Sequence, residues 1–131
     1  MIWDTSVWRF VLAVVVYFAL GGLWYSPVMF AKTWMAALGK KASDMSGGGK
    51  SMFFAFLPLI VMVFAEAYFA HVTSTHGLWR GFYLGLKLGL GFVAAQAVLN
   101  NFFQKGNWKL VAIDAGYAVV GLGLAGAILA Y

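Results

Sequence analysis

Three ionisable side chains lie inside long apolar stretches of the sequence: Glu66, Lys87 and Asp114. A charge inside the hydrocarbon part of a bilayer is costly, and ionisable residues there usually face protein or water. Such groups can bind a proton, pair with each other or contact a polar solute. These three residues are therefore the first candidates for chemistry in this chain.

The depths of Glu66 and Lys87 suggest that they meet. With a rise of ~1.5 Å per residue, Glu66 lies ~21 Å and Lys87 ~18–20 Å from the ends of their segments on the same side of the membrane. We therefore expect an intramembrane charge pair. The pair could hold two helices together or serve a substrate or proton, and the alternative is that each side chain extends separately toward the interface.

Asp114 belongs to a different layer, ~9 Å inside its own segment. Aromatic and polar residues of two other segments lie at that depth, and we expect Tyr117, one turn away, to be its hydrogen-bond partner. The layer is a predicted ligand site for a cation or proton, or alternatively a structural hydrogen-bond cluster. Its residues are Trp24, Tyr25, Ser26, Asn100, Asp114 and Tyr117.

The composition indicates that these residues lie in a membrane. Of 131 residues, 63% are hydrophobic and 10% are charged, against roughly 45–50% and about 25% in soluble proteins. A soluble fold of this size would leave much of its apolar surface in water. The net charge of +5 comes from scattered basic residues, which fits membrane orientation better than nucleic-acid binding. We expect a lipid bilayer and no nucleic acid as partners.

Four apolar segments are long enough to cross a bilayer as α-helices of ~20 residues each. We expect one all-α membrane domain over 1–131, an antiparallel bundle of two hairpins because the connections are short. An interfacial segment and a flexible loop are expected over 28–50, and turns at 73–77 and 100–107. The expected spans are 6–26, 52–72, 78–99 and 108–130.

Pro27 ends the first span, because proline lacks an N–H and leaves the carbonyl of Leu23 without its helical donor. In the third span, glycines recur every four residues, and Gln96 and Asn100 extend the same face. Small residues allow close helix contact. The predicted packing residues are Gly81, Gly85, Gly89 and, in the fourth span, Gly121.

Lys87 lies almost opposite this glycine ridge. We expect one of the two faces to pack within the protomer and the other to meet a second subunit or a water-filled path. The chain is therefore predicted to form a homo-oligomer, most simply a twofold dimer.

Several catalytic classes are excluded or disfavoured. The chain has no cysteine, so it has no disulfide, thiol nucleophile or cysteine–zinc cluster. His71 and His76 are five residues apart and do not share a helical face. Because no Ser-His-Asp, paired-carboxylate or metal-helix spacing is present, we expect no metal, no cofactor and no enzymatic activity.

The loop charges predict an orientation. The first and third loops carry six lysines, whereas the other side carries Arg9 and Arg80. Under the positive-inside rule, both termini lie outside the cytoplasm. The loop lysines are Lys32, Lys40, Lys41, Lys50, Lys105 and Lys109.

The run 21–27, GGLWYSP, followed by Phe30 and by Trp34 and Met35, resembles the signature of a bacterial membrane family, the domain of unknown function 1761. The run 113–117, IDAGY, is similar to the start of that family's last helix. The resemblance covers nearly the whole chain. It implies a four-helix protein of the bacterial plasma membrane and no established activity. The positions it singles out are Trp24, Tyr25, Ser26, Pro27, Asp114 and Tyr117.

Two functions fit the sequence. The first is a transporter- or channel-like oligomer that carries a small ion or solute with Glu66, Lys87 and Asp114. The alternative is a non-transporting helical module that associates with itself or with a membrane partner. A water-accessible cavity at the three residues would favour transport.

Overall fold

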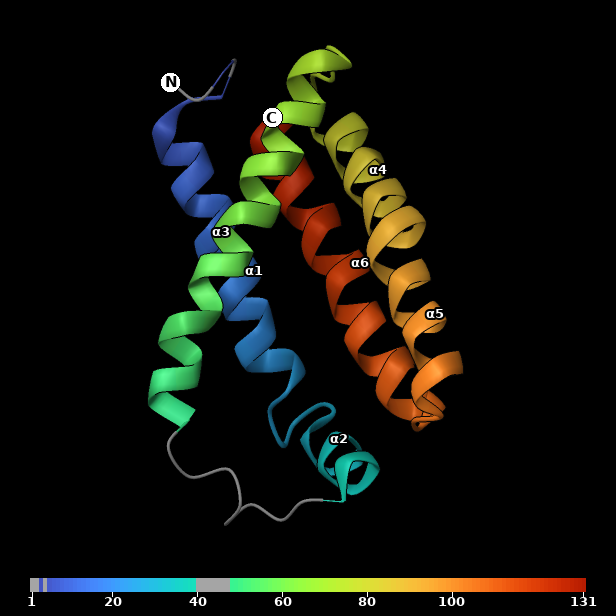
Figure 1. The fold of residues 1–131 in the computed structure, drawn as a ribbon. Coiled ribbons are helices and arrows are strands. Elements are labelled where there is room, and N and C mark those ends of the chain that lie inside the picture. Colours follow the sequence, from blue (N-terminus) through green and yellow to red (C-terminus); the bar gives the residue numbers. More distant parts are fainter. Residues whose placement is uncertain (1–2, 4, 40–47) are drawn as a thin grey trace.

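The computed structural model describes residue 3, residues 5–39 and residues 48–131 (Figure 1). Four helical rods are long and apolar enough to cross a membrane, and the third consists of α4, η2 and α5 without a break. The predicted all-α fold with four spans is confirmed. The elements are α1 Val7–Trp24, α2 Ala31–Leu38, α3 Gly48–Val72, α4 Leu78–Leu88, the π-helical segment η2 Gly89–Ala94, α5 Ala95–Gln104 and α6 Trp108–Ala130.

Two boundaries differ from those predicted. Helix α3 already begins at Gly48, so the end of the expected loop is helical, and residues 40–47 of that loop lie outside the described residues. The third rod continues through Gln104, so Asn100 and Asn101 are helical and do not form a turn. The chain reverses at Lys105, which has the left-handed conformation with φ 54°.

The first span ends before Pro27, as the sequence predicts. Pro27 cannot donate a hydrogen bond to the Leu23 carbonyl, and Ser26 donates to it instead, from its backbone nitrogen at 3.1 Å and from its hydroxyl at 2.6 Å. The carbonyl is therefore satisfied locally and does not form an open ligand position. The short helix α2 follows and ends at Gly39 in the left-handed region, with φ 72°.

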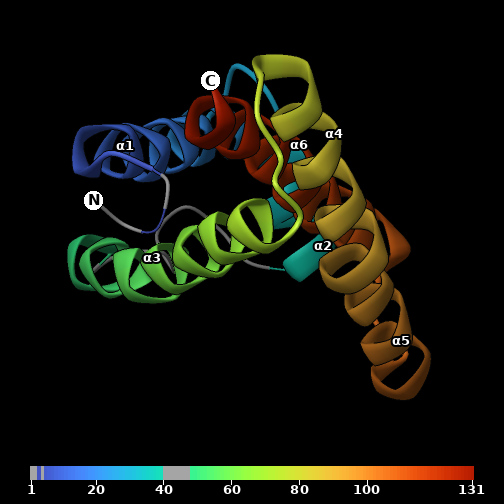
Figure 2. The ribbon, with the colours of Figure 1, turned by 90° about the horizontal axis from the view of Figure 1, so that it is seen from above.

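Helix α6 lies at the centre of the molecule, and every other described helical element packs against it. In the view from above, α1 and α3 lie on one side of α6 and the α4–α5 rod lies on the other (Figure 2). Rods that follow one another in the chain run antiparallel, and the start of α1 lies at the same end of the bundle as the end of α6, opposite α2 (Figure 1). Helices α1 and α3, together with Val93 of η2, line the space beside the part of α6 that carries Asp114.

The glycine ridge of α4 packs within the protomer, against α6. A side chain at Gly81 would overlap the carbonyl oxygen of Gly126, and one at Gly85 would overlap that of Leu122. At Gly89, an added Cβ would lie 2.8 Å from the Cα atom of α6 residue Val119. The two backbones therefore touch along three turns, which only glycine permits.

The predicted extension of this ridge to Gln96 and Asn100 is wrong. The π-helical turn of η2 takes up an extra residue, so the inward face passes through half-buried Val93 and Ala97 to buried Asn101. Gln96 and Asn100 are exposed, and the side-chain Nε2 of Gln96 donates a hydrogen bond to the side-chain Oδ1 of Asn100 at 3.0 Å.

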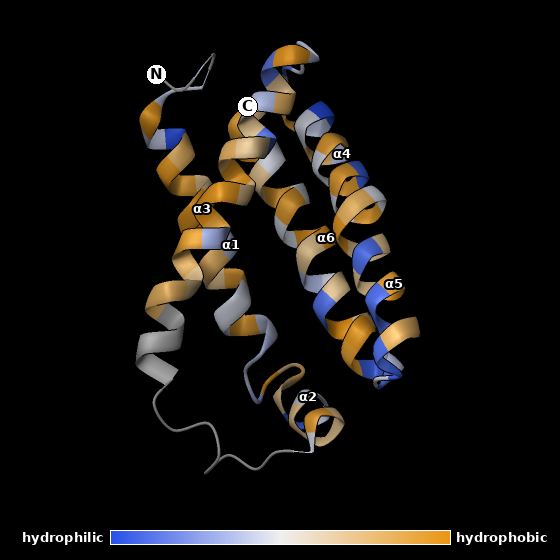
Figure 3. Ribbon diagram, in the orientation of Figure 1, coloured by the Kyte–Doolittle hydropathy of each residue, from blue (hydrophilic) through white to orange (hydrophobic). Residues whose placement is uncertain are grey.

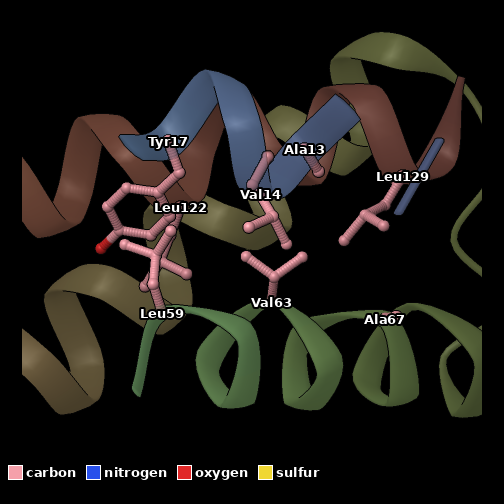
Figure 4. Close-up of a cluster of buried hydrophobic side chains, with 9 residues drawn as sticks. Ala13, Val14, Tyr17, Leu59, Val63, Ala67, Leu122 and Leu129 are labelled. Carbon is pink, nitrogen blue, oxygen red and sulfur yellow. The ribbon is translucent and has the colours of Figure 1, made fainter. Parts of the chain in front are cut away.

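The hydrophobic core lies between α1, α3 and α6 (Figure 4). Val14 and Val63 point toward each other across α1 and α3, and Gly121 of α6 leaves the space that the Tyr17 ring occupies. Large apolar side chains are exposed along α1 and α3, and the coloured parts of these two ribbons are mostly hydrophobic (Figure 3), as a bilayer requires. The core cluster consists of Ala13, Val14, Tyr17, Leu59, Val63, Ala67, Leu122, Ala125 and Leu129.

Candidate functional site

A cavity of about 540 Å³, here called the main cavity, lies between α1, α3 and α6 at the α2 end of the bundle. Its volume is in the range of ~300–1,000 Å³ that is typical of ligand pockets. Most of its wall is apolar, and its polar groups are one carboxyl group and tyrosine hydroxyls. The lining residues are Tyr17, Phe18, Gly21, Gly22, Tyr25, Ala55, Pro58, Leu59, Met62, Val93, Asp114, Tyr117 and Ala118.

Tyr25 and Asp114 form the polar edge of the main cavity. The Tyr25 hydroxyl donates a hydrogen bond to Oδ1 of Asp114 at 2.6 Å, a length typical of a bond to an ionised acceptor. Burial, this hydrogen bond and the charge of Asp114 all raise the pKa of Tyr25 above its usual value. The hydroxyl therefore remains a donor at physiological pH and holds the carboxylate in place.

The predicted hydrogen bond between Asp114 and Tyr117 is wrong. Tyr117 instead donates from its hydroxyl to the backbone carbonyl of Tyr17 at 2.8 Å, and its ring lies edge-on to the rings of Tyr17 and Tyr25, with centroids 5.1 and 5.5 Å away. Gly21 makes this possible, because a Cβ there would lie 2.7 Å from the Tyr117 hydroxyl.

Trp24 fixes the end of α1 to α6. Its indole nitrogen donates to the carbonyl of Ile113 at 2.9 Å, and its ring would lie 3.1 Å from a Cβ added at Gly116. The ring also contacts Phe30, with centroids 4.9 Å apart. Two adjacent residues, Trp24 and Tyr25, thus bond to two adjacent residues of α6.

The structure brings together four of the six residues in the predicted layer: Trp24, Tyr25, Asp114 and Tyr117. Ser26 is adjacent, but its hydroxyl bonds to its own helix end. Asn100 is on the exposed side of α5. Sequence reasoning missed Tyr17 and Gly21. Residues 17, 21 and 25 are spaced four apart, so Tyr17, Gly21 and Tyr25 share one helical face.

Glu66 and Lys87 do not form the predicted charge pair. Glu66 is 1% exposed and both of its carboxyl oxygens have no hydrogen-bond partner, whereas Lys87 is exposed. Gly85 occupies the side of α4 that faces Glu66, and a residue two positions later points to the opposite side of the helix. Equal depth was therefore insufficient for contact.

A second, smaller space of about 100 Å³, here called the terminal pocket, lies at the end of the bundle where Thr5 and Tyr131 are found. Both histidines, His71 and His76, line it together with Thr5 and Arg9, although the sequence predicts no shared face for the histidines. The His71 ring also stacks on Trp3 at 6.4 Å between centroids.

Replacing Tyr25 with phenylalanine is expected to lower the unfolding free energy by about 1 kcal/mol, because it removes a hydrogen bond to a charged group near the protein surface. Thermal unfolding of the purified protein, followed by tryptophan fluorescence, measures the change. Tyr83→Phe is the matched control, since Tyr83 is 56% exposed on α4 and does not line the main cavity. Equal melting temperatures for both variants would contradict the role of the Tyr25–Asp114 bond.

Four membrane-length helices, three of them packed around α6, enclose a cavity lined mainly by α1, α3 and α6, and together they define a multi-pass helical membrane protein. The family model described as "Protein of unknown function (DUF1761)" matches residues 8–130, so the chain belongs to this family. The resemblance inferred from the sequence is thereby confirmed. No curated protein and no solved structure matches the chain.

Proposed function

We propose that this protein is a small membrane carrier that binds a lipophilic organic cation in the main cavity. The observation that carries this proposal is a carboxylate, Asp114, beside aromatic rings at the edge of a mainly apolar space. The cavity supports binding and passage of a solute rather than chemistry on it, so we also propose that the protein is not an enzyme.

The wall of the main cavity matches a cation that carries apolar groups. Tyr25 and Tyr117 present aromatic rings, which attract cations, and Asp114 supplies the opposite charge. A carboxylate has about four acceptor positions, so the bond from Tyr25 leaves capacity for a ligand. Leu59 and Met62 of α3 supply apolar contact. An anion would meet the carboxylate, and a strongly hydrated metal ion would gain little from the apolar wall.

The core cluster separates the main cavity from the terminal pocket. Tyr17 and Leu59 belong to both the core cluster and the wall of the main cavity, while Ala67 and Leu129 belong to both the core cluster and the wall of the terminal pocket. A solute in the main cavity is thus closed off from the end of the bundle where the termini lie. A binding site near one side with a packed barrier beyond it supports a carrier that alternates between states rather than an open channel.

Two alanines of α6 test whether the main cavity admits water. We expect Ala118→Cys to react with a charged, membrane-impermeant thiol reagent in nanodiscs, because Ala118 lines the main cavity. Ala125→Cys is the matched control, since Ala125 is 0% exposed in the core cluster. The native chain has no cysteine, so each label reports one position. Protection of both cysteines would contradict a solute-accessible cavity.

The exposed polar side of the α4–α5 rod favours a second candidate function, a module that acts through self-association (Figure 3). Lys87, Gln96 and Asn100 are all exposed there. Amide side chains facing lipid are costly and commonly hydrogen-bond across helices. We propose that two copies meet through this side in a homodimer, which is compatible with a carrier and is all that a non-transporting module needs.

Single cysteines test this dimer. We expect Asn100→Cys to form a disulfide-linked dimer when membrane vesicles are oxidised, because the residue lies in the proposed contact. Val61→Cys should remain monomeric, since Val61 is 66% exposed among the apolar residues of α3. Cross-linking at residue 61 without cross-linking at residue 100 would place the contact elsewhere and contradict the proposal.

We further propose that the protein lies in a bacterial plasma membrane with its α2 end in the cytoplasm. Lys32 and Lys109 line one shallow pocket at that end, and an excess of basic residues on one side supports a cytoplasmic position for it. Both termini are then extracytoplasmic. Fusion of a reporter that is active only in the cytoplasm should give signal from a loop at the α2 end and none from either terminus.

A further inference from the structure

We propose that Glu66 is a proton-binding site at the crossing of α4 and α6. This site is separate from the main cavity and does not depend on the solute proposed for it. Glu66 is 1% exposed, and neither carboxyl oxygen has a hydrogen-bond partner. A buried polar group without a partner is unusual in native structures and calls for an explanation.

The space around Glu66 is formed by glycines of two helices. Its Oε2 atom lies 2.7 Å from the position of a Cβ at Gly85 and 2.9 Å from one at Gly126. Alanine at either position would therefore displace the carboxyl group. The glycines of α4 and α6 therefore allow the two helices to pack closely. They also leave room for the Glu66 carboxyl group between the helices.

The charged and titratable groups near Glu66 do not compensate a negative charge. Among the described residues, Tyr17 of α1 is the titratable side chain that interacts with it electrostatically, and a tyrosine carries no positive charge. On α4 the inward residue is Gly85 and Lys87 is exposed. The facing residues of α6 are Leu122 and Gly126.

A proton is the ligand that fits these surroundings. An isolated carboxylate anion in an apolar interior costs a far larger desolvation free energy than the neutral acid does. Calcium or magnesium needs about six oxygen ligands, and one carboxyl group between helices supplies two. A proton needs one oxygen and no further space. Protonation of Glu66 would therefore allow this side chain to remain buried in the apolar interior.

Glu66 lines a groove of about 210 Å³ whose other lining residues are all apolar. Met62 and Val93 line both this groove and the main cavity, so Glu66 lies one helical turn of α3 from the main cavity. Loss of the proton would leave an anion at the crossing where backbone carbonyls of Leu122 and Gly126 face α4. Proton release would therefore weaken the contact between α4 and α6.

Glu66 is the only glutamate in the sequence, so ¹³C-labelled glutamate marks this one side chain in the native protein. We expect infrared or solid-state NMR spectra in nanodiscs to show the neutral acid at neutral pH. The signal should convert reversibly to that of the carboxylate as the pH is raised. A carboxylate signal at neutral pH, or an acid signal that never changes with pH, would overturn the proposal.

Thermal unfolding of Glu66→Gln provides a second measurement, because glutamine resembles the neutral acid and cannot lose a proton. We expect the wild type to lose stability relative to Glu66→Gln as the pH rises from about 4.3 to neutral, since the unfolded chain then releases the Glu66 proton that the folded chain keeps. Other titrating groups affect both proteins equally. A constant difference in melting temperature across this pH range would count against a proton-binding site.

Discussion

Replacement of Gly85 by alanine is expected to lower the unfolding free energy by about 3 kcal/mol, at the upper end of the range for overpacked sites. The added Cβ would overlap the carbonyl oxygen of Leu122 and lie 2.7 Å from the Glu66 carboxyl group. A backbone oxygen cannot move away as a flexible side chain can, so α4 and α6 must separate. Thermal unfolding in detergent, with size-exclusion chromatography after heating, measures the loss.

Gly91→Ala is the matched control for this prediction. Gly91 lies in η2 of the same rod, and a Cβ there would meet no atom within 4 Å. Alanine is also the better helix former, so this variant should be as stable as the wild type or slightly more stable. Equal melting temperatures for Gly85→Ala and Gly91→Ala would contradict the backbone contact between α4 and α6.

Replacement of Asp114 by asparagine is expected to weaken the binding of tetraphenylphosphonium by at least about tenfold, which is ~1.4 kcal/mol. The substitution keeps the size of the side chain and removes the negative charge. Two opposite charges ~4 Å apart near a protein surface attract with about 4 kcal/mol, so a tenfold loss is a lower bound. Binding isotherms of the purified protein in nanodiscs provide the measurement.

A neutral ligand of similar shape separates charge from fit. Triphenylphosphine oxide fills apolar space without a positive charge, so its affinity should change little in Asp114→Asn. Tyr83→Phe, outside the main cavity, should bind both compounds as the wild type does. Equal losses for the cation and the neutral compound would contradict charge recognition by Asp114.

The sequence was sufficient to predict the class of fold and one layer of the site. The scarcity of charged residues predicted a membrane environment. The four apolar runs predicted four spans, because a bilayer restricts helix length. Depth along each helix also placed Tyr25 near Asp114, and the structure shows them hydrogen-bonded. Depth is predictable because α-helical rise is regular.

The direction in which each side chain points was harder to predict. Depth placed Glu66 level with Lys87, but the glycine ridge turns Lys87 away from α3. The π-helical turn of η2 shifts the inward face by one residue, so Asn101 is buried where Asn100 was expected. Such a turn depends on tertiary packing against α6 and has no reliable pattern in one sequence. The same limit applies to Tyr117, whose hydroxyl donates to the Tyr17 carbonyl of α1 and not to Asp114 of its own helix.

The most direct test of the main cavity as a cation site is a set of binding isotherms for tetraphenylphosphonium. The proteins compared are the wild type, Asp114→Asn and Ala118→Phe, whose larger side chain fills the space that Ala118 lines. We predict one saturable site per chain in the wild type, a weaker site in Asp114→Asn and no site in Ala118→Phe. No saturable binding to the wild type, or equal binding to all three proteins, would contradict a cation site in the main cavity.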